Sequence, residues 1–217
     1  MKKVITATIL LLTISCKSQT ENSSGINKTN TMEKFNINKY NNLPINPKTG
    51  LQILPNGDDV QMFKGSGNIG FVERINKAGT PYLFFKSFYE NGNLQAEGVD
   101  FYSMSIRIYK EYSENGELIK EIDYDKDYKF SIEDLQKEMK ESYNVDIMDK
   151  KQTRSVGRTK IDTRLKFPYY QVIVNSGVAS FTDYLLNGNT GEVIYKLSYV
   201  RDYEKDVIDE YLKSLKQ

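Results

Sequence analysis

Aromatic and polar residues alternate through the middle of the chain, and one pattern of them is written twice. Residues 84–99 read FFKSFYENGNLQAEGV and residues 108–123 read IYKEYSENGELIKEID, so that equivalent positions such as Phe85 and Tyr109 lie 24 residues apart. In each copy the aromatic run leads to Glu-Asn-Gly, which supplies the positive φ angles of a tight turn, and a leucine then restarts the alternation. We therefore predict two β-hairpins that are copies of one supersecondary unit.

Turn residues divide the flanking segments into further short apolar runs. Asn56-Gly57 and Gly79 punctuate the segment before the repeats, and Ser176-Gly177 punctuates the segment near the C-terminus. Short alternating runs bounded by such residues are typical of antiparallel strands. The predicted strands cover residues 51–54, 60–63, 69–75, 169–175, 181–186 and 193–200.

Two helices are predicted from periodicity and capping. Ser131 and Asp134 have the spacing of a capping box, and Asn144 is a natural stop. The apolar stripe of this helix is Ile132, Leu135, Met139 and Tyr143. Asp202 is the expected cap of a final helix. Its apolar face is Val207, Ile208, Tyr211, Leu212 and Leu215.

These elements predict an α+β fold, in which an antiparallel β-rich half with two hairpin repeats is followed by a helix, an antiparallel meander and a helix. We expect a signal peptide over residues 1–15 and a flexible tether over 16–42. A β-rich domain over 43–130, with the repeats at 84–124, then precedes an α+β module over 131–217.

The repeats resemble a known family. Their aromatic, Asn-Gly and Leu positions are similar to the MORN-type tandem repeats of the antitoxin-like subfamily. That family joins its units through a glycine-rich turn, whereas residues 100–105 read Asp-Phe-Tyr-Ser-Met-Ser here. The resemblance therefore implies two degenerate copies absorbed into a larger sheet, in a protein that binds a partner.

The C-terminal half carries a second resemblance. Residues 188–194 read Gly-Asn-Thr-Gly-Glu-Val-Ile and enter the last predicted strand, and a helix precedes the meander. Over residues 131–200 this looks like a PepSY domain. The resemblance implies an extracytoplasmic binding or protease-inhibiting module, with no catalytic residue to carry over.

The N-terminus reads as an export signal. Lys2 and Lys3 precede an apolar run over residues 4–14, which is too short to span a bilayer as a stable helix. The only cysteine, Cys16, follows Ser15 and resembles the lipidated cysteine of bacterial lipoproteins, although Leu12 lies one residue further from it than usual. The resemblance implies lipidation at Cys16 and a lipid anchor in the cell envelope, at the outer membrane. The alternative is a secreted chain with a spare thiol.

Charge and composition limit the classes of partner that the chain can bind. The 30 basic and 29 acidic residues become 28 and 29 once Lys2 and Lys3 are removed, a net charge of −1. This balance argues against nucleic-acid binding, which needs a strong positive field. No further cysteine is present to form a disulfide, so a hydrophobic core has to stabilise the mature chain.

Two motifs have competing interpretations. Residues 65–70 match Gly-x-Gly-x-x-Gly, but a strand rather than a helix follows, so we interpret them as a loop and not as a dinucleotide site. Four carboxylates have part of the spacing of a calcium loop, although Tyr128 stands where that loop needs glycine. We interpret the segment as a solvated strand end, with a calcium site as the alternative. The calcium candidates are Asp123, Asp125, Asp127 and Asp134.

Candidate binding residues come from the tyrosines and from a basic segment. Residues 150–166 carry seven basic residues, Arg158 among them, and we interpret them as a solvated basic loop that could also meet an acidic partner surface or lipid head groups. Sixteen tyrosines supply rings with polar tips, which suit interfaces. The candidate binding residues are Tyr89, Tyr102, Tyr112 and Arg158.

Catalytic chemistry is poorly represented. The chain has no histidine, which removes the commonest general base and the usual zinc ligands. We expect no enzyme activity, no cofactor and no catalytic residue, although a carboxylate pair across a cleft would still permit glycoside hydrolysis. The expected function is a membrane-anchored protein that binds a protein partner, as an immunity protein neutralises an envelope-active toxin. The alternative is an envelope housekeeping lipoprotein, acting as an assembly scaffold or as a protease inhibitor.

Overall fold

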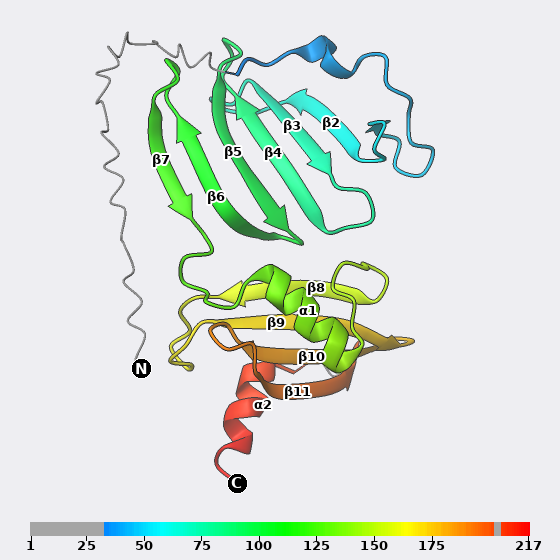
Figure 1. Ribbon diagram of the computed structural model, residues 1–217, viewed down its shortest axis with the longest axis vertical. Helices are drawn as coiled ribbons and strands as arrows, with labels where there is room; N and C mark the ends of the chain where they lie inside the picture. The colour runs from blue at the N-terminus through cyan, green and yellow to red at the C-terminus, as the bar shows by residue number, and fades with distance from the viewer. Residues whose placement is uncertain (1–32, 202–204) are drawn as a thin grey trace, which may run out of the picture. The chain divides into compact units, whose positions relative to one another are not determined.

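Two antiparallel sheets and two α-helices make up the described chain, which confirms the predicted α+β class. The computed structural model describes residues 33–201 and 205–217 (Figure 1). The first sheet has seven strands in sequence order: β1 (Gln52–Ile53), β2 (Asp59–Lys64), β3 (Phe71–Asn76), β4 (Tyr82–Phe88), β5 (Leu94–Phe101), β6 (Met104–Tyr112) and β7 (Leu118–Asp123). The second sheet has the order β11-β10-β9-β8: β8 (Thr153–Thr159), β9 (Tyr169–Gly177), β10 (Ser180–Asn187) and β11 (Val193–Val200). The helices are a short 3₁₀ helix, η1 (Ile37–Tyr40), and two α-helices, α1 (Ile132–Tyr143) and α2 (Val207–Ser214).

The segments with the repeated pattern form the hairpins β4–β5 and β6–β7, and their turns are alike. In both turns the N–H of the first loop residue donates to the carbonyl of the fifth, at 2.9 Å in β4–β5 and 2.8 Å in β6–β7. Gly92 and Gly116 occupy the same place in the two turns, with φ values of 82° and 86°. Glycine adopts this left-handed conformation without steric cost, which explains why Asn-Gly occurs at both turns.

Helix α1 agrees with the prediction from sequence. Ser131 and Asp134 form both hydrogen bonds of the capping box, and Asn144 ends the helix in the left-handed conformation with a φ of 54°. Ile132, Leu135 and Met139 are buried. The predicted stripe is therefore the face that α1 packs into the core.

The predicted loop between β2 and β3 is also confirmed. Residues 65–70 join two antiparallel strands, and no helix follows them that could receive a phosphate. Gly70 is needed because a Cβ atom there would lie 2.6 Å from the backbone of Glu90.

The interpretation of residues 150–166 as a solvated loop is wrong over Thr153–Thr159, which form β8. Thr153 and Val156 are buried, and Val156 lies opposite Val172 of β9. The sequence does not indicate this strand, because it has few apolar positions and many basic ones. Pairing with β9 fixes the conformation of the segment.

The start of the last helix also differs from the prediction. Asp206 caps α2 by accepting hydrogen bonds from the N–H groups of Ile208 and Asp209, whereas Asp202 lies outside the described residues. Val207 and Ile208 of the predicted apolar face are buried against β10 and β11, but Leu215 follows the helix and is exposed. No described helix is long and apolar enough to cross a membrane.

One hydrophobic cluster joins the first sheet to the second. Phe101 of β5 and Ile106 of β6 belong to the same buried cluster as Leu135 and Met139 of α1 and Tyr170 of β9. None of these side chains is more than 2% exposed. The ends of β5 and β6 therefore share a core with the C-terminal module.

Arg158 reinforces this junction, which corrects its expected role as an exposed binding residue. Its side chain is only 5% exposed, and its guanidinium lies 2.7 Å from a carboxylate oxygen of Asp125. It also donates to the carbonyl of Ser105 at 2.9 Å and stacks over the ring of Tyr128 at 4.5 Å. Arginine suits such a site because its planar guanidinium can bond and stack at once.

Tyr102 is a second junction residue and not an exposed ring. It lies in the turn between β5 and β6, with a φ of 55°. Its hydroxyl donates to the carbonyl of Ile147 at 2.9 Å and lies 3.3 Å from that of Thr153. Burial raises the pKa of Tyr102 to about 12. The polar tip that would have met a partner is used within the chain.

Replacing Arg158 should destabilise the whole fold. Arg158→Ala leaves the Asp125 carboxylate and the Ser105 carbonyl without their partner, and we expect the free energy of unfolding to fall by about 1–3 kcal/mol because Asp125 is partly solvated. Urea unfolding followed by circular dichroism measures the change. Lys151→Ala, at an exposed position of the same basic segment, should change it by less than about 0.5 kcal/mol. Equal effects of the two substitutions would contradict the structural role of Arg158.

Candidate functional site

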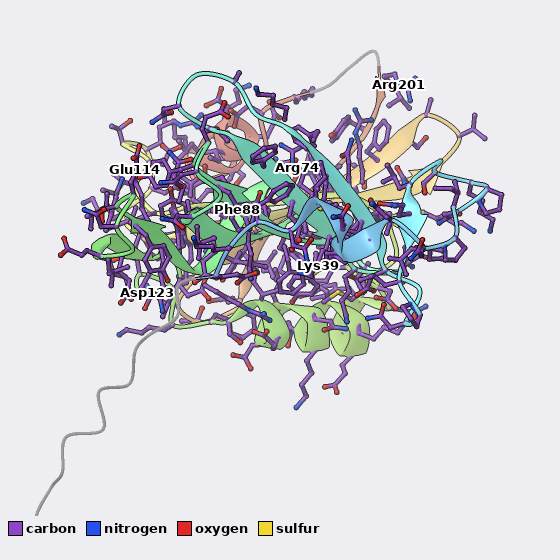
Figure 2. All side chains as sticks on the ribbon, turned by 90° about the horizontal axis from the view of Figure 1, so that it is seen from above. Lys39, Arg74, Phe88, Glu114, Asp123 and Arg201 are labelled. Atoms are coloured by element: carbon purple, nitrogen blue, oxygen red, sulfur yellow. The ribbon has the colours of Figure 1, made fainter. Side chains whose placement is uncertain are left out.

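A hollow of about 490 Å³ lies over the strands β3 to β6 on one face of the first sheet. Segments before β2 contribute Lys39 of η1 and Asp58 to its wall. Figure 2 shows Lys39 on the blue η1 segment, whereas Glu114 and Asp123 lie at the left of the view. The floor consists of two parallel rows of side chains that run across the strands.

The first row is apolar. Strand register places Ile75, Phe84 and Val99 side by side on β3, β4 and β5. Ile108 of β6 lines the same hollow and is 46% exposed. We call these four residues the apolar row. Large apolar side chains left in a hollow of the surface are typical of sites where another molecule docks.

The second row is charged and alternates in sign. Register places one charged residue on each of the five strands β3 to β7, directly opposite one another. On β3 to β6 each lies two positions along its strand from the member of the apolar row, and therefore on the same face of the sheet. Opposite charges directly across antiparallel strands stabilise a sheet. We call this set the charged row: Glu73, Lys86, Glu97, Lys110 and Glu121.

Neighbouring groups hold the charged residues of the hollow in place. Lys39 lies 3.3 Å from the Glu73 carboxylate, which is only 5% exposed, and Lys77 lies 3.7 Å from that of Asp58. Burial lowers the pKa of Lys39, but its contacts with Tyr40 and Glu73 outweigh that effect and raise it, so Lys39 stays cationic. Three lysines and three carboxylates line the hollow, so its net charge is zero.

Tyr112, a candidate from the sequence, touches the charged row. Its hydroxyl donates to a carboxylate oxygen of Glu97 at 2.9 Å. Burial, together with this hydrogen bond, raises the pKa of Tyr112 to about 12. The hydroxyl of Tyr89 in turn donates to the backbone carbonyl of Tyr112 at 2.7 Å. Of the four candidates, the structure thus brings Tyr89 and Tyr112 together and leaves Tyr102 and Arg158 at the junction.

The carboxylates considered for calcium each have another partner, and that of Asp123 accepts a hydrogen bond from the N–H of Asp125 at 2.9 Å. Asp125 pairs with Arg158, and Asp127 lies 2.7 Å from the Lys160 ammonium. The Asp134 carboxylate accepts hydrogen bonds from the hydroxyl and the N–H of Ser131 in the capping box of α1, and these bonds lower its pKa. Over residues 33–201 and 205–217, no group of three or more acidic residues could hold a metal ion. Cys16, the predicted lipidation site, lies outside these residues.

The charged row was missed in the sequence, although part of it was visible. Lys86 and Lys110 are equivalent in the repeats, as are Glu97 and Glu121. The spacing alone does not show that the four side chains form one line with Glu73, because that depends on the strand register. A Lys and a Glu at fixed places in a repeated hairpin are the signal that could have indicated such a row.

No known protein family, curated protein or solved structure matches the chain.

Tyr112 should make the stability depend on pH above 10. Its pKa rises from 10.0 in the unfolded chain to about 12 in the fold, so the unfolded chain loses this proton first. The free energy of unfolding should therefore fall as the pH rises from 10 towards 12. Tyr112→Phe should lose less stability over this window than the wild type, whereas Tyr124→Phe, at an exposed position, should behave like the wild type. Urea titrations at a series of pH values measure the difference, and identical curves for all three proteins would contradict this coupling.

Proposed function

We propose that the chain is an exported, lipid-anchored envelope protein that binds a protein partner without catalysing a reaction. The observation that carries the proposal is the apolar row beside the charged row. An apolar centre next to polar groups of both signs is the usual anatomy of a protein interface. The zero net charge of the hollow favours a polypeptide over a nucleic acid, which needs a positive surface.

The two hairpins support the repeat interpretation behind this proposal. Phe88 lies opposite Leu94 and Tyr112 lies opposite Leu118, and an irregularity in the ladder comes directly before Phe88 and directly before Tyr112. The equivalent turn hydrogen bonds described above agree with this register. We infer that β4–β5 and β6–β7 are copies of one unit, as in the antitoxin-like repeats that the sequence resembles.

The hydrogen bonds between the two copies also fit a stacked pair of units. The Asn93 amide donates to the carbonyl of Glu114 at 2.7 Å, and Tyr89 reaches the carbonyl of Tyr112. The positions equivalent to Tyr89 and Asn93 in the second copy are Ser113 and Glu117. The second copy therefore lacks the side chains with which the first copy holds its neighbour.

A role as an immunity protein accounts for both the anchor and the binding surface. Lys2, Lys3, the apolar run that follows and Cys16 support export and lipidation. A protein held at the outer membrane would meet a toxin that enters from outside the cell. Each carboxylate of the hollow is already engaged by a lysine or by Tyr112, which supports binding over acid-base catalysis.

An affinity capture with the mature chain tests this proposal. Cys16→Ser with a C-terminal tag is exposed to lysates of the same cells and of neighbouring strains, and the recovered proteins are identified by mass spectrometry. We expect one stoichiometric partner. Ile108→Lys should reduce its recovery at least about tenfold, because a buried apolar anchor commonly contributes more than 1.4 kcal/mol to binding.

Ile161→Lys is the matched control, since Ile161 is 76% exposed and does not line the hollow. It should leave the recovery unchanged. A toxin-like partner supports the immunity role, whereas envelope assembly factors or proteases would favour the housekeeping alternative. No stoichiometric partner, or equal recovery by both variants, would contradict binding through the hollow.

A further inference from the structure

Strand β7 is the last strand of the first sheet, and no other described strand pairs with its outer edge. Within the described residues it pairs only with β6, and five of its six residues are exposed. Leu118 and Ile119 are 52% and 57% exposed. The opposite edge strand, β1, has only two residues. Proteins usually shorten or cover such edges, because the free backbone groups pair readily with another chain.

The backbone groups of β7 that point outward can be assigned. The N–H of Tyr124 donates to the carbonyl of Arg107 at 2.9 Å, across the continuation of the same ladder. Backbone groups of successive residues alternate between the two sides of an antiparallel strand. The N–H and C=O groups of Glu121 and Asp123 therefore point away from β6, towards the open side.

The first hairpin shows what this edge can accept. Its second strand, β5, occupies the place that β7 has in the second hairpin, and β6 pairs with the outer side of β5. Glu97 of β5 lies opposite a lysine on each side, Lys86 and Lys110. Glu121 of β7 lies opposite Lys110 on one side only. The charged row thus ends on a carboxylate with an open position beside it.

Pairing between two copies of this edge is disfavoured by charge. In a two-fold antiparallel pair, residues at equal distances from the axis face each other. A pair centred on Lys120 or on Glu121 sets that side chain against its own copy, and a pair centred on Ile122 sets Glu121 against Asp123. Like charges directly opposite destabilise a sheet, so the edge favours a different chain.

We propose that β7 is a strand-addition site, which accepts an extended segment of another protein as an antiparallel eighth strand. The segment carries a basic residue opposite Glu121 and an acidic residue opposite Lys120, as Lys110 and Glu111 are placed beside β5. Main-chain hydrogen bonds supply the affinity of such a site and side chains supply the specificity. This inference rests on the proposed protein-binding function and names how the partner docks.

A peptide with the sequence of Met104–Tyr112 is the direct probe, because the repeat equivalence places its Lys110 opposite Glu121 and its Glu111 opposite Lys120. Binding of the labelled peptide to the mature Cys16→Ser chain is measured by fluorescence anisotropy. Glu121→Pro removes the outward N–H donor and should weaken binding about tenfold, since proline is tolerated where an edge N–H faces solvent. Thermal melts check that each variant is folded.

Charge exchange gives a second and milder test at the same position. Glu121→Lys should weaken binding of this peptide up to about fivefold, and a peptide with Lys110→Glu should restore it. Glu192→Lys, the same substitution at an exposed residue of the turn before β11, should have no effect.

Two outcomes would overturn the inference. One is no binding of the peptide to the wild type at a peptide concentration of about 1 mM, because a strand-addition site should bind with a Kd below this concentration. The other is equal binding by the wild type and Glu121→Pro. In the capture experiment, a partner lost with Ile108→Lys but kept with Glu121→Pro would refute strand addition and leave the proposed function intact. If neither variant lost the partner, both strand addition at β7 and binding through the hollow would be refuted.

Discussion

The packing of β5 and β6 against the C-terminal module is the constraint on which the rest of the structure depends. Phe101 and Ile106 have no place to be buried within a single-layered sheet, and they are buried instead among Leu135, Met139 and Tyr170. A sheet needs a second layer to cover an apolar face. The helix α1 and the second sheet supply that layer at this end of the first sheet.

The junction explains why polar residues expected at the surface are used inside the fold. A shared apolar core removes backbone carbonyls and part of the Asp125 carboxylate from water, and these groups need partners. Arg158 supplies them for Asp125 and Ser105, and Tyr102 supplies one for Ile147. The proposed partner surface is therefore the hollow over β3 to β6, where the apolar row and the charged row lie.

Local signals made much of the fold predictable. The Asn-Gly turns, the capping box of Ser131 and Asp134 and the alternation over the C-terminal meander depend on neighbours in sequence, and the structure agrees with them. The strand β8 could not be predicted, because its few apolar positions give a weak pattern and its conformation depends on pairing with β9. The burial of Arg158 could not be predicted either, because it depends on Ser105 and Asp125, which are distant in sequence. The candidate site falls between these cases. The repeats indicated Lys86 and Glu97, but only the strand register shows the row to which they belong.

Amide hydrogen exchange measured residue by residue tests most directly whether the shared core makes one cooperative unit. We expect the slowest amides of β5 and β6 to open with the same free energy as those of β9 and β10, because one buried cluster includes residues of all four strands. The account would be contradicted if the amides of β9 and β10 stayed protected by more than about 2 kcal/mol beyond those of β5 and β6. That result would mean that the first sheet unfolds independently of the module that covers it.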